Sequence, residues 1–134
     1  MMKEGYIDGK ILILDDEREI CILVKSILKR VKNFEVKIAD SVGAALDVIK
    51  KEPFDFYIFD YRLGDGTSIE VIHELKKTYS FERQIPVVVM SAYTSDEDIR
   101  KLEEVGIELF IPKPLKREDI VSCAENFFNT QSNP

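Results

Sequence analysis

Acidic, hydroxyl and basic side chains stand where short apolar runs of this chain end. Asp15 and Asp16 follow the first run, and Asp60 closes the third. Ser91 closes the fourth run, and Lys113 comes shortly after the fifth. Runs of this length and composition are typical of strands buried on both faces of a parallel sheet. Because the carboxyl ends of parallel strands meet at one edge of a sheet, we expect these side chains to lie close together.

Carboxylates gathered in one place repel one another, and the repulsion raises the pKa of at least one of them. A hard divalent cation such as Mg²⁺ removes that difficulty, because it takes oxygen ligands in octahedral geometry and keeps several waters. Lys113 adds a compact positive charge and Ser91 adds a hydroxyl donor. A metal ion, an ammonium and a hydroxyl around Asp60 could hold three phosphoryl oxygens. The predicted chemistry is in-line transfer of a phosphoryl group to Asp60, followed by hydrolysis of the acyl phosphate.

Strand-like and helix-like segments alternate five times along the chain. The apolar runs predict strands over 10–14, 35–39, 54–60, 86–91 and 108–111. Helical spacing predicts helices over 17–32, 69–79 and 120–128. Two more helices are predicted by their end signals. One runs from a cap at Asp40 or Ser41 to Pro53, and the other from a capping box at Ser95 and Asp98 to Gly106. This alternation predicts a doubly wound α/β domain, with a five-stranded parallel sheet in the order 2-1-3-4-5 and five helices.

The length and composition favour a single globular domain. The 134 residues suffice for one core, which we expect over residues 10–128, after an extension at 1–9 and before a flexible tail at 129–134. With 19 basic and 25 acidic residues the net charge is −6, which argues against direct binding of nucleic acid. No apolar run reaches the roughly 18 residues of a membrane span, and no secretory signal opens the chain. Cys21 and Cys123 lack metal-type spacing, which favours reduced thiols and a cytoplasmic location.

The motifs at these strand ends, in this order, resemble the receiver domain of two-component response regulators. The resemblance extends from about Lys10 to Phe128, and it implies a flavodoxin-like receiver architecture. It rests on the acidic pair Asp15-Asp16 after Ile11-Leu12-Ile13-Leu14, on Asp60 in Phe59-Asp60-Tyr61-Arg62-Leu63, on Ser91-Ala92, on Phe110, and on Lys113-Pro114.

The resemblance implies roles for the residues around the acceptor. Asp60 would accept the phosphoryl group, and Lys113 would pair with it. Asp16 would bind Mg²⁺ directly, whereas Asp15 would bind it largely through water. The main-chain carbonyl of Arg62 would complete the protein's share of the metal ligands, so that the metal site comprises Asp15, Asp16, Asp60 and Arg62. The peptide bond that follows Lys113 is expected to be cis.

The resemblance also implies a conformational switch. Ser91 would contact the phosphate and move toward it, while Phe110 would turn inward, so that one covalent charge biases a two-state element. Arg62 and Tyr93 occupy positions that tune the lifetime of the phosphoryl group, and we expect them to slow access of the attacking water. Two residues depart from the family pattern. Gly64 stands where proline is common, which should loosen the loop, and Phe110 lacks the hydroxyl of the more frequent tyrosine.

The implied phosphodonor is a histidine kinase or a histidine phosphotransfer protein. A downstream protein target or an output domain would read the phosphorylated state at the face formed by the fourth helix, the fifth strand and the fifth helix. A homodimer through the same face is also compatible with the resemblance. On this interpretation the chain is a signalling module, and it is an enzyme only in assisting its own phosphorylation and dephosphorylation.

Three other functions fit parts of the pattern. The same fold could serve as an unphosphorylated binding module. A Mg²⁺-dependent phosphohydrolase could turn over small phosphate esters through an Asp60 intermediate, although Arg62 replaces the second acid expected two residues further on, and no insertion forms a substrate cap. Flavin binding is a further alternative for this topology, but Asp15-Asp16-Glu17 stands where a phosphate-binding loop is expected after the first strand.

Overall fold

The computed structural model describes residues 6–81, 85–92 and 95–132, with side chains described as far as Phe128. Its five main strands form one parallel sheet in the order β2-β1-β3-β6-β7, which confirms the predicted order of the five sheet strands along the chain. These strands are β1 (Gly9–Leu14), β2 (Phe34–Ala39), β3 (Phe56–Asp60), β6 (Val87–Ser91) and β7 (Leu109–Pro112).

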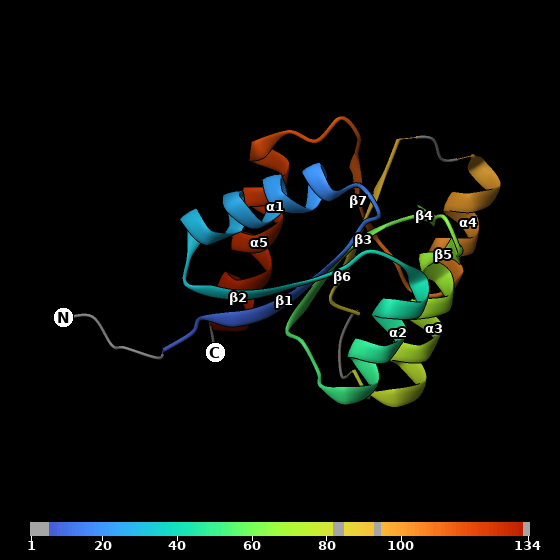
Figure 1. The fold of residues 1–134 in the computed structure, drawn as a ribbon, viewed down its shortest axis with the longest axis horizontal. Helices are drawn as coiled ribbons and strands as arrows, with labels where there is room; N and C mark the ends of the chain where they lie inside the picture. Colours follow the sequence, from blue (N-terminus) through green and yellow to red (C-terminus); the bar gives the residue numbers. More distant parts are fainter. Residues whose placement is uncertain (1–5, 82–84, 93–94, 133–134) are drawn as a thin grey trace.

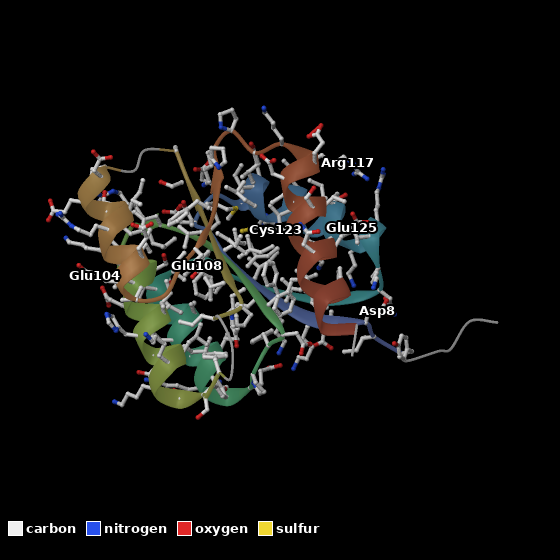
Figure 2. All side chains as sticks on the ribbon, turned by 180° about the vertical axis from the view of Figure 1, so that it is seen from behind. Asp8, Glu104, Glu108, Arg117, Cys123 and Glu125 are labelled. Carbon is white, nitrogen blue, oxygen red and sulfur yellow. The ribbon has the colours of Figure 1, made fainter. Side chains whose placement is uncertain are left out.

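Five helices cover the two faces of the sheet. They are α1 (Arg18–Val31), α2 (Val42–Lys51), α3 (Ser68–Thr78), α4 (Asp96–Glu104) and α5 (Arg117–Ser132). Figure 1 shows α1 and α5 on one side of the sheet, and α2, α3 and α4 on the other. Seen from behind in Figure 2, Arg117 lies at the start of α5, and Cys123 and Glu125 lie further along it. The doubly wound α/β architecture predicted from the alternation of strands and helices is therefore confirmed.

The strands are buried on both faces because their side chains alternate between two apolar clusters. In β1, Ile11 and Ile13 pack toward α1 and α5, whereas Leu12 and Leu14 pack into the cluster that includes residues of α2 and α3. The central strand β3 divides in the same way, with Phe56 on the first side. This two-sided burial explains why the strands are near-continuous apolar runs in the sequence.

The ends of the helices also follow local sequence signals. The side chain of Ser41 caps α2 by accepting a hydrogen bond from the Ala44 N–H. Ser95 and Asp98 form the predicted capping box at the start of α4. Gly106 lies just beyond that helix with a φ of +98°, a conformation that residues with a β-carbon rarely adopt.

Two features of the chain differ from the prediction. A short antiparallel hairpin of β4 (Arg62–Leu63) and β5 (Gly66–Thr67) follows β3, where only a loop was expected. In addition, α5 continues to Ser132, although we placed the end of the last helix at Phe128. The flexibility of the tail stays a prediction.

Two further sequence predictions can be compared with the described residues. Within them, no helix combines the length and the apolar character that crossing a bilayer requires. Cys21 and Cys123 are both free thiols, as their separation in the sequence indicated.

Candidate functional site

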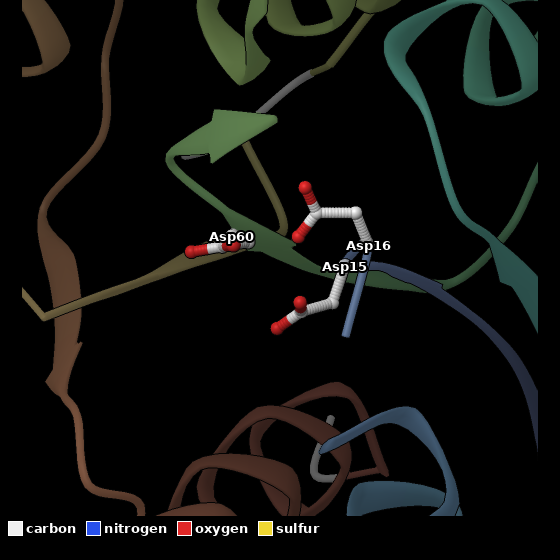
Figure 3. Close-up of side chains that lie close together, drawn as sticks. All are labelled: Asp15, Asp16 and Asp60. Carbon is white, nitrogen blue, oxygen red and sulfur yellow. The ribbon is translucent and has the colours of Figure 1, made fainter. Parts of the chain in front are cut away.

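Three carboxylates meet where β1 and β3 end side by side. The two strands are parallel neighbours, with Leu14 opposite Phe59, so Asp15 and Asp60 follow at the same level. Asp15, Asp16 and Asp60 each offer an oxygen atom, and these atoms lie within 4.8 Å of one another. Figure 3 shows the three side chains grouped at this strand edge. The structure therefore brings together the acidic residues that the sequence placed on separate strands.

Lys113 reaches the same place from the segment after β7. Its Nζ lies 2.8 Å from Oδ2 of Asp15 and 3.3 Å from Oδ1 of Asp60, and its side chain is only 9% exposed. The backbone N–H of Lys113 donates to the carbonyl of Ser91 at the end of β6, which fixes the segment beside the sheet. The Lys113–Pro114 peptide bond is cis, as predicted.

Burial and charge act together on these groups. Burial raises the pKa of Asp60 to about 6, the charge of Asp15 adds to that effect, and Lys113 opposes it. For Lys113, burial alone would lower the pKa, but its hydrogen bond to Asp15 and the charges of Asp60 and Asp15 raise it overall. Lys113 thus stays charged at neutral pH. Among the described residues, Lys113 pairs with Asp15, Glu17 and Asp60 and Asp16 lies beside them, so the acidic cluster keeps a net negative charge that a cation could balance.

The donor set fits a hard divalent cation. Both oxygens of Asp15 are already engaged, Oδ1 with the N–H of Glu17 at 2.8 Å and Oδ2 with Lys113. Asp16 is exposed and lies within reach of the other two carboxylates. An exposed carboxylate beside two buried ones is compatible with Mg²⁺, which needs few protein ligands and retains waters.

The other residues predicted for the site lie in different surroundings. Ser91 is half-buried at the end of β6, where it pairs in register with Pro112. Phe110 lies in β7 with 37% of its surface exposed, so it faces outward in this structure. Tyr93 lies outside the described residues. Arg62 is exposed in β4, two residues beyond Asp60.

One contact of Arg62 was not predicted from the sequence. Its Nη2 lies 3.0 Å from Oδ2 of Asp98 in α4, and the hydroxyl of Tyr61 donates to Oδ1 of the same carboxylate at 2.8 Å. From the sequence, we assigned Asp98 only to the capping box with Ser95. The local pattern of a capping box predicts the partner on the same helix, but it carries no signal for side chains about 36 residues away.

A cavity of about 340 Å³ opens beside the carboxylates, on the side of α1 and β2. Two of its lining side chains are apolar and exposed, with Ile22 at 55% and Ile38 at 42%. The cavity is lined by Asp15, Asp16, Arg18, Cys21, Ile22, Ile38 and Asp40. The cavity thus combines apolar and charged side chains next to Asp15 and Asp16.

The chain is similar to known proteins over most of its length. Residues 11–125 match the family model described as "Response regulator receiver domain". Among curated proteins, it is 28% identical over 116 residues to the nisin biosynthesis regulatory protein NisR of Lactococcus lactis, and 31% identical over 126 residues to the response regulator protein PilR of Pseudomonas aeruginosa. The matches cover 87% and 92% of this chain, but only 48% and 27% of those relatives, so the chain spans at most about half of their length.

A solved structure agrees with these sequence matches. The CheY-like response regulator receiver domain protein of Methanospirillum hungatei JF-1 superimposes with a TM-score of 0.77 at 27% sequence identity. The superposition covers 92% of this chain and 95% of that protein's chain.

Proposed function

This chain belongs to the response regulator receiver domain family, and on that premise we propose that Asp60 accepts a phosphoryl group from a histidine side chain of a partner protein. One observation carries the proposal. The ammonium of Lys113 lies 2.8 Å from Asp15 and 3.3 Å from Asp60, although these residues come from distant segments of the chain. A carboxylate beside a fixed ammonium and two further acids is suited to receive an anionic group together with a cation.

The proposed transfer is an in-line displacement at phosphorus. An oxygen of Asp60 attacks, the bond between phosphorus and the donor nitrogen breaks, and its electrons stay on the imidazole, which takes a proton from solvent. In the later hydrolysis, a water oxygen attacks phosphorus and loses a proton. The bond to Asp60 then breaks, the carboxylate is regenerated, and inorganic phosphate leaves.

The residues around Asp60 have separate tasks in this proposal. Asp16 and Asp60 would hold Mg²⁺ directly with the main-chain carbonyl of Arg62, and Asp15 would hold it largely through water. The two hydrogen-bonded oxygens of Asp15 support that indirect role. When bound, Mg²⁺ neutralises charge that gathers on the phosphoryl oxygens. Lys113 would pair with a phosphoryl oxygen.

Ser91 and Phe110 would couple phosphorylation of Asp60 to a conformational change at the surface of the domain. The hydroxyl of Ser91, at the end of β6, would bond to a phosphoryl oxygen, and Phe110 would leave its exposed position and turn inward. The face formed by α4, β7 and α5 would then present a different surface to a target protein, to an output domain or to a second copy of the chain. A cytoplasmic location and a role without substrate turnover are parts of the same proposal.

The cavity beside the site supports docking of a protein donor. The exposed side chains of Ile22 and Ile38 line it together with Asp15 and Asp16, so a partner that covers these two apolar side chains would bring its histidine toward the acceptor. We expect the partner to be a histidine kinase or a histidine phosphotransfer protein.

The first test uses a small donor in place of the partner. The protein is incubated with Mg²⁺ and acetyl phosphate or phosphoramidate, and its intact mass is measured. We expect a gain of one phosphoryl group, and no gain in Asp60→Ala. Absence of any gain would favour the unphosphorylated binding module. Continuous turnover of small phosphate esters would instead favour the phosphohydrolase.

A further inference from the structure

The carboxylate of Asp98 joins the start of α4 to the two residues that follow Asp60. It is only 11% exposed, and it accepts three hydrogen bonds: the Tyr61 hydroxyl at 2.8 Å, Arg62 Nη2 at 3.0 Å, and the Ser95 N–H at 3.4 Å. Figure 1 shows α4 lying beside the β4–β5 hairpin that carries Arg62. The bond to Ser95 belongs to the capping box, but the other two leave the helix entirely.

Tyr61 is held at both of its ends. Its backbone N–H is shared between the carbonyl of Met90, at 3.0 Å, and Oδ1 of Asp60, also at 3.0 Å. Its side chain is 3% exposed and reaches Asp98 through the hydroxyl. A buried hydroxyl–carboxylate bond is a strong constraint, because neither group can exchange its partner for water without opening the core. The position of the acceptor carboxylate therefore depends on a residue whose far end is fixed by α4.

The side chain of Arg62 is less constrained than that of Tyr61. It is 65% exposed. Its guanidinium forms the ion pair with Asp98 and also lies 5.2 Å from the centre of the Tyr61 ring. An exposed ion pair contributes little to stability, but it selects one position of a long side chain. The hydrogen bond from Tyr61 lowers the pKa of Asp98, and Ser95 and the charge of Arg62 act in the same direction. Asp98 thus remains an acceptor for both partners at neutral pH.

We propose that Asp98 is a positioning residue of the phosphorylation site, which fixes Tyr61 and Arg62 beside Asp60 and so lengthens the lifetime of the phosphoryl group. This inference rests on the proposed function of Asp60. Hydrolysis requires a water in line with the bond between phosphorus and the carboxylate oxygen. Because Asp98 constrains Tyr61 and selects one position of the Arg62 side chain, it limits the arrangements of the site in which that water can approach. Because Asp98 lies in the first turn of α4, a partner that rearranges this turn would also disturb its contacts with Tyr61 and Arg62 and so change the phosphoryl lifetime.

The test measures loss of the phosphoryl group by intact mass after the donor is removed. We expect Asp98→Asn and Arg62→Ala each to shorten the lifetime by about threefold or more, because either change breaks the ion pair that selects one position of the arginine side chain. The double variant should be no faster than the faster single variant, since both changes act through one contact. Should Asp98→Asn fail to fold, Tyr61→Phe replaces it, because it removes the buried hydroxyl and keeps the ring.

A matched control separates positioning from helix stability. Ser95→Ala removes the hydroxyl that caps α4 but leaves the Asp98 contacts with Tyr61 and Arg62 in place. We expect this variant to lose thermal stability and to keep the wild-type phosphoryl lifetime. Equal lifetimes in Asp98→Asn and wild type, or shortening in Ser95→Ala as large as in Asp98→Asn, would overturn the inference while the proposed function stands. If the wild-type protein takes up no phosphoryl group, the proposed function fails and the inference fails with it.

Discussion

At the scale of single residues, Asp60 is a carboxylate that folding removes almost completely from water. It is 8% exposed, next to a second buried acid, and its pKa is raised to about 6. Folding therefore places a carboxylate where its charged form is disfavoured, and Lys113 offsets only part of that cost. Such an acid is poised for a ligand that supplies positive charge, and this is the role that the proposed Mg²⁺ fulfils.

The raised pKa of Asp60 predicts that the effect of Asp60→Asn on the free energy of unfolding depends on pH. Since the pKa of Asp60 is higher in the folded chain than in the unfolded one, the favourable contribution of its neutral form is complete below about pH 4 and is lost as the pH rises through about 6. In the absence of Mg²⁺, Asp60→Asn should be more stable than wild type by on the order of 2 kcal/mol at pH 7.5. Near pH 4 the difference should vanish. Urea unfolding at the two pH values measures it, and a variant that is no more stable at pH 7.5 would contradict the argument.

At the scale of elements, the parts of the fold that were predictable are those with a repeating apolar pattern. The strands that end at Leu14 and Asp60 are continuous apolar runs, and parallel topology alone then brought Asp15 and Asp60 together. The β4–β5 hairpin was not predicted, because strands of two residues are too short to show an alternating apolar pattern. The contact of Tyr61 with Asp98 was missed for a different reason, since it depends on where α4 packs, and the sequence of the helix does not encode that position locally.

The end of α4 supplies a prediction about element boundaries. Gly106 has a φ of +98°, and a β-carbon there would lie 3.3 Å from Cδ1 of Ile85. We expect Gly106→Ala to destabilise the protein by about 1–2 kcal/mol, because alanine is strained in this conformation and also meets a neighbour. The matched control is Gly64→Ala, since nothing lies within 4 Å of its added β-carbon. That variant should stay within about 0.5 kcal/mol of wild type in chemical unfolding. Equal losses in both variants would show that the strain at Gly106 is not the cause.

At the scale of the whole molecule, charged side chains from distant parts of the sequence meet at one edge of the sheet. Asp15 comes from the first strand, Asp60 from the central one, and Lys113 from the segment after the last. The site therefore exists only when the sheet is complete, and a ligand that binds there stabilises the whole fold.

Mg²⁺ should accordingly raise the unfolding temperature of the protein. At a concentration ten times its dissociation constant, the expected gain is about 1.4 kcal/mol. Asp16 gives a sharp control because it is exposed and its removal costs the metal-free fold little. Thermal unfolding of Asp16→Asn should match wild type without metal and should respond far less to Mg²⁺. An undiminished response in Asp16→Asn would remove this residue from the metal site.

The most direct test of the account locates the phosphoryl group on the protein. Wild type, Asp60→Asn and Asp55→Asn are treated with Mg²⁺ and a phosphodonor, and the intact masses are compared. Asp55 is a suitable control because it is an exposed acid just before β3, at the end of that strand remote from Asp60, where it accepts a hydrogen bond from the Lys10 N–H. We expect one phosphoryl group on wild type and on Asp55→Asn, and none on Asp60→Asn. A phosphoryl group retained by Asp60→Asn would contradict it.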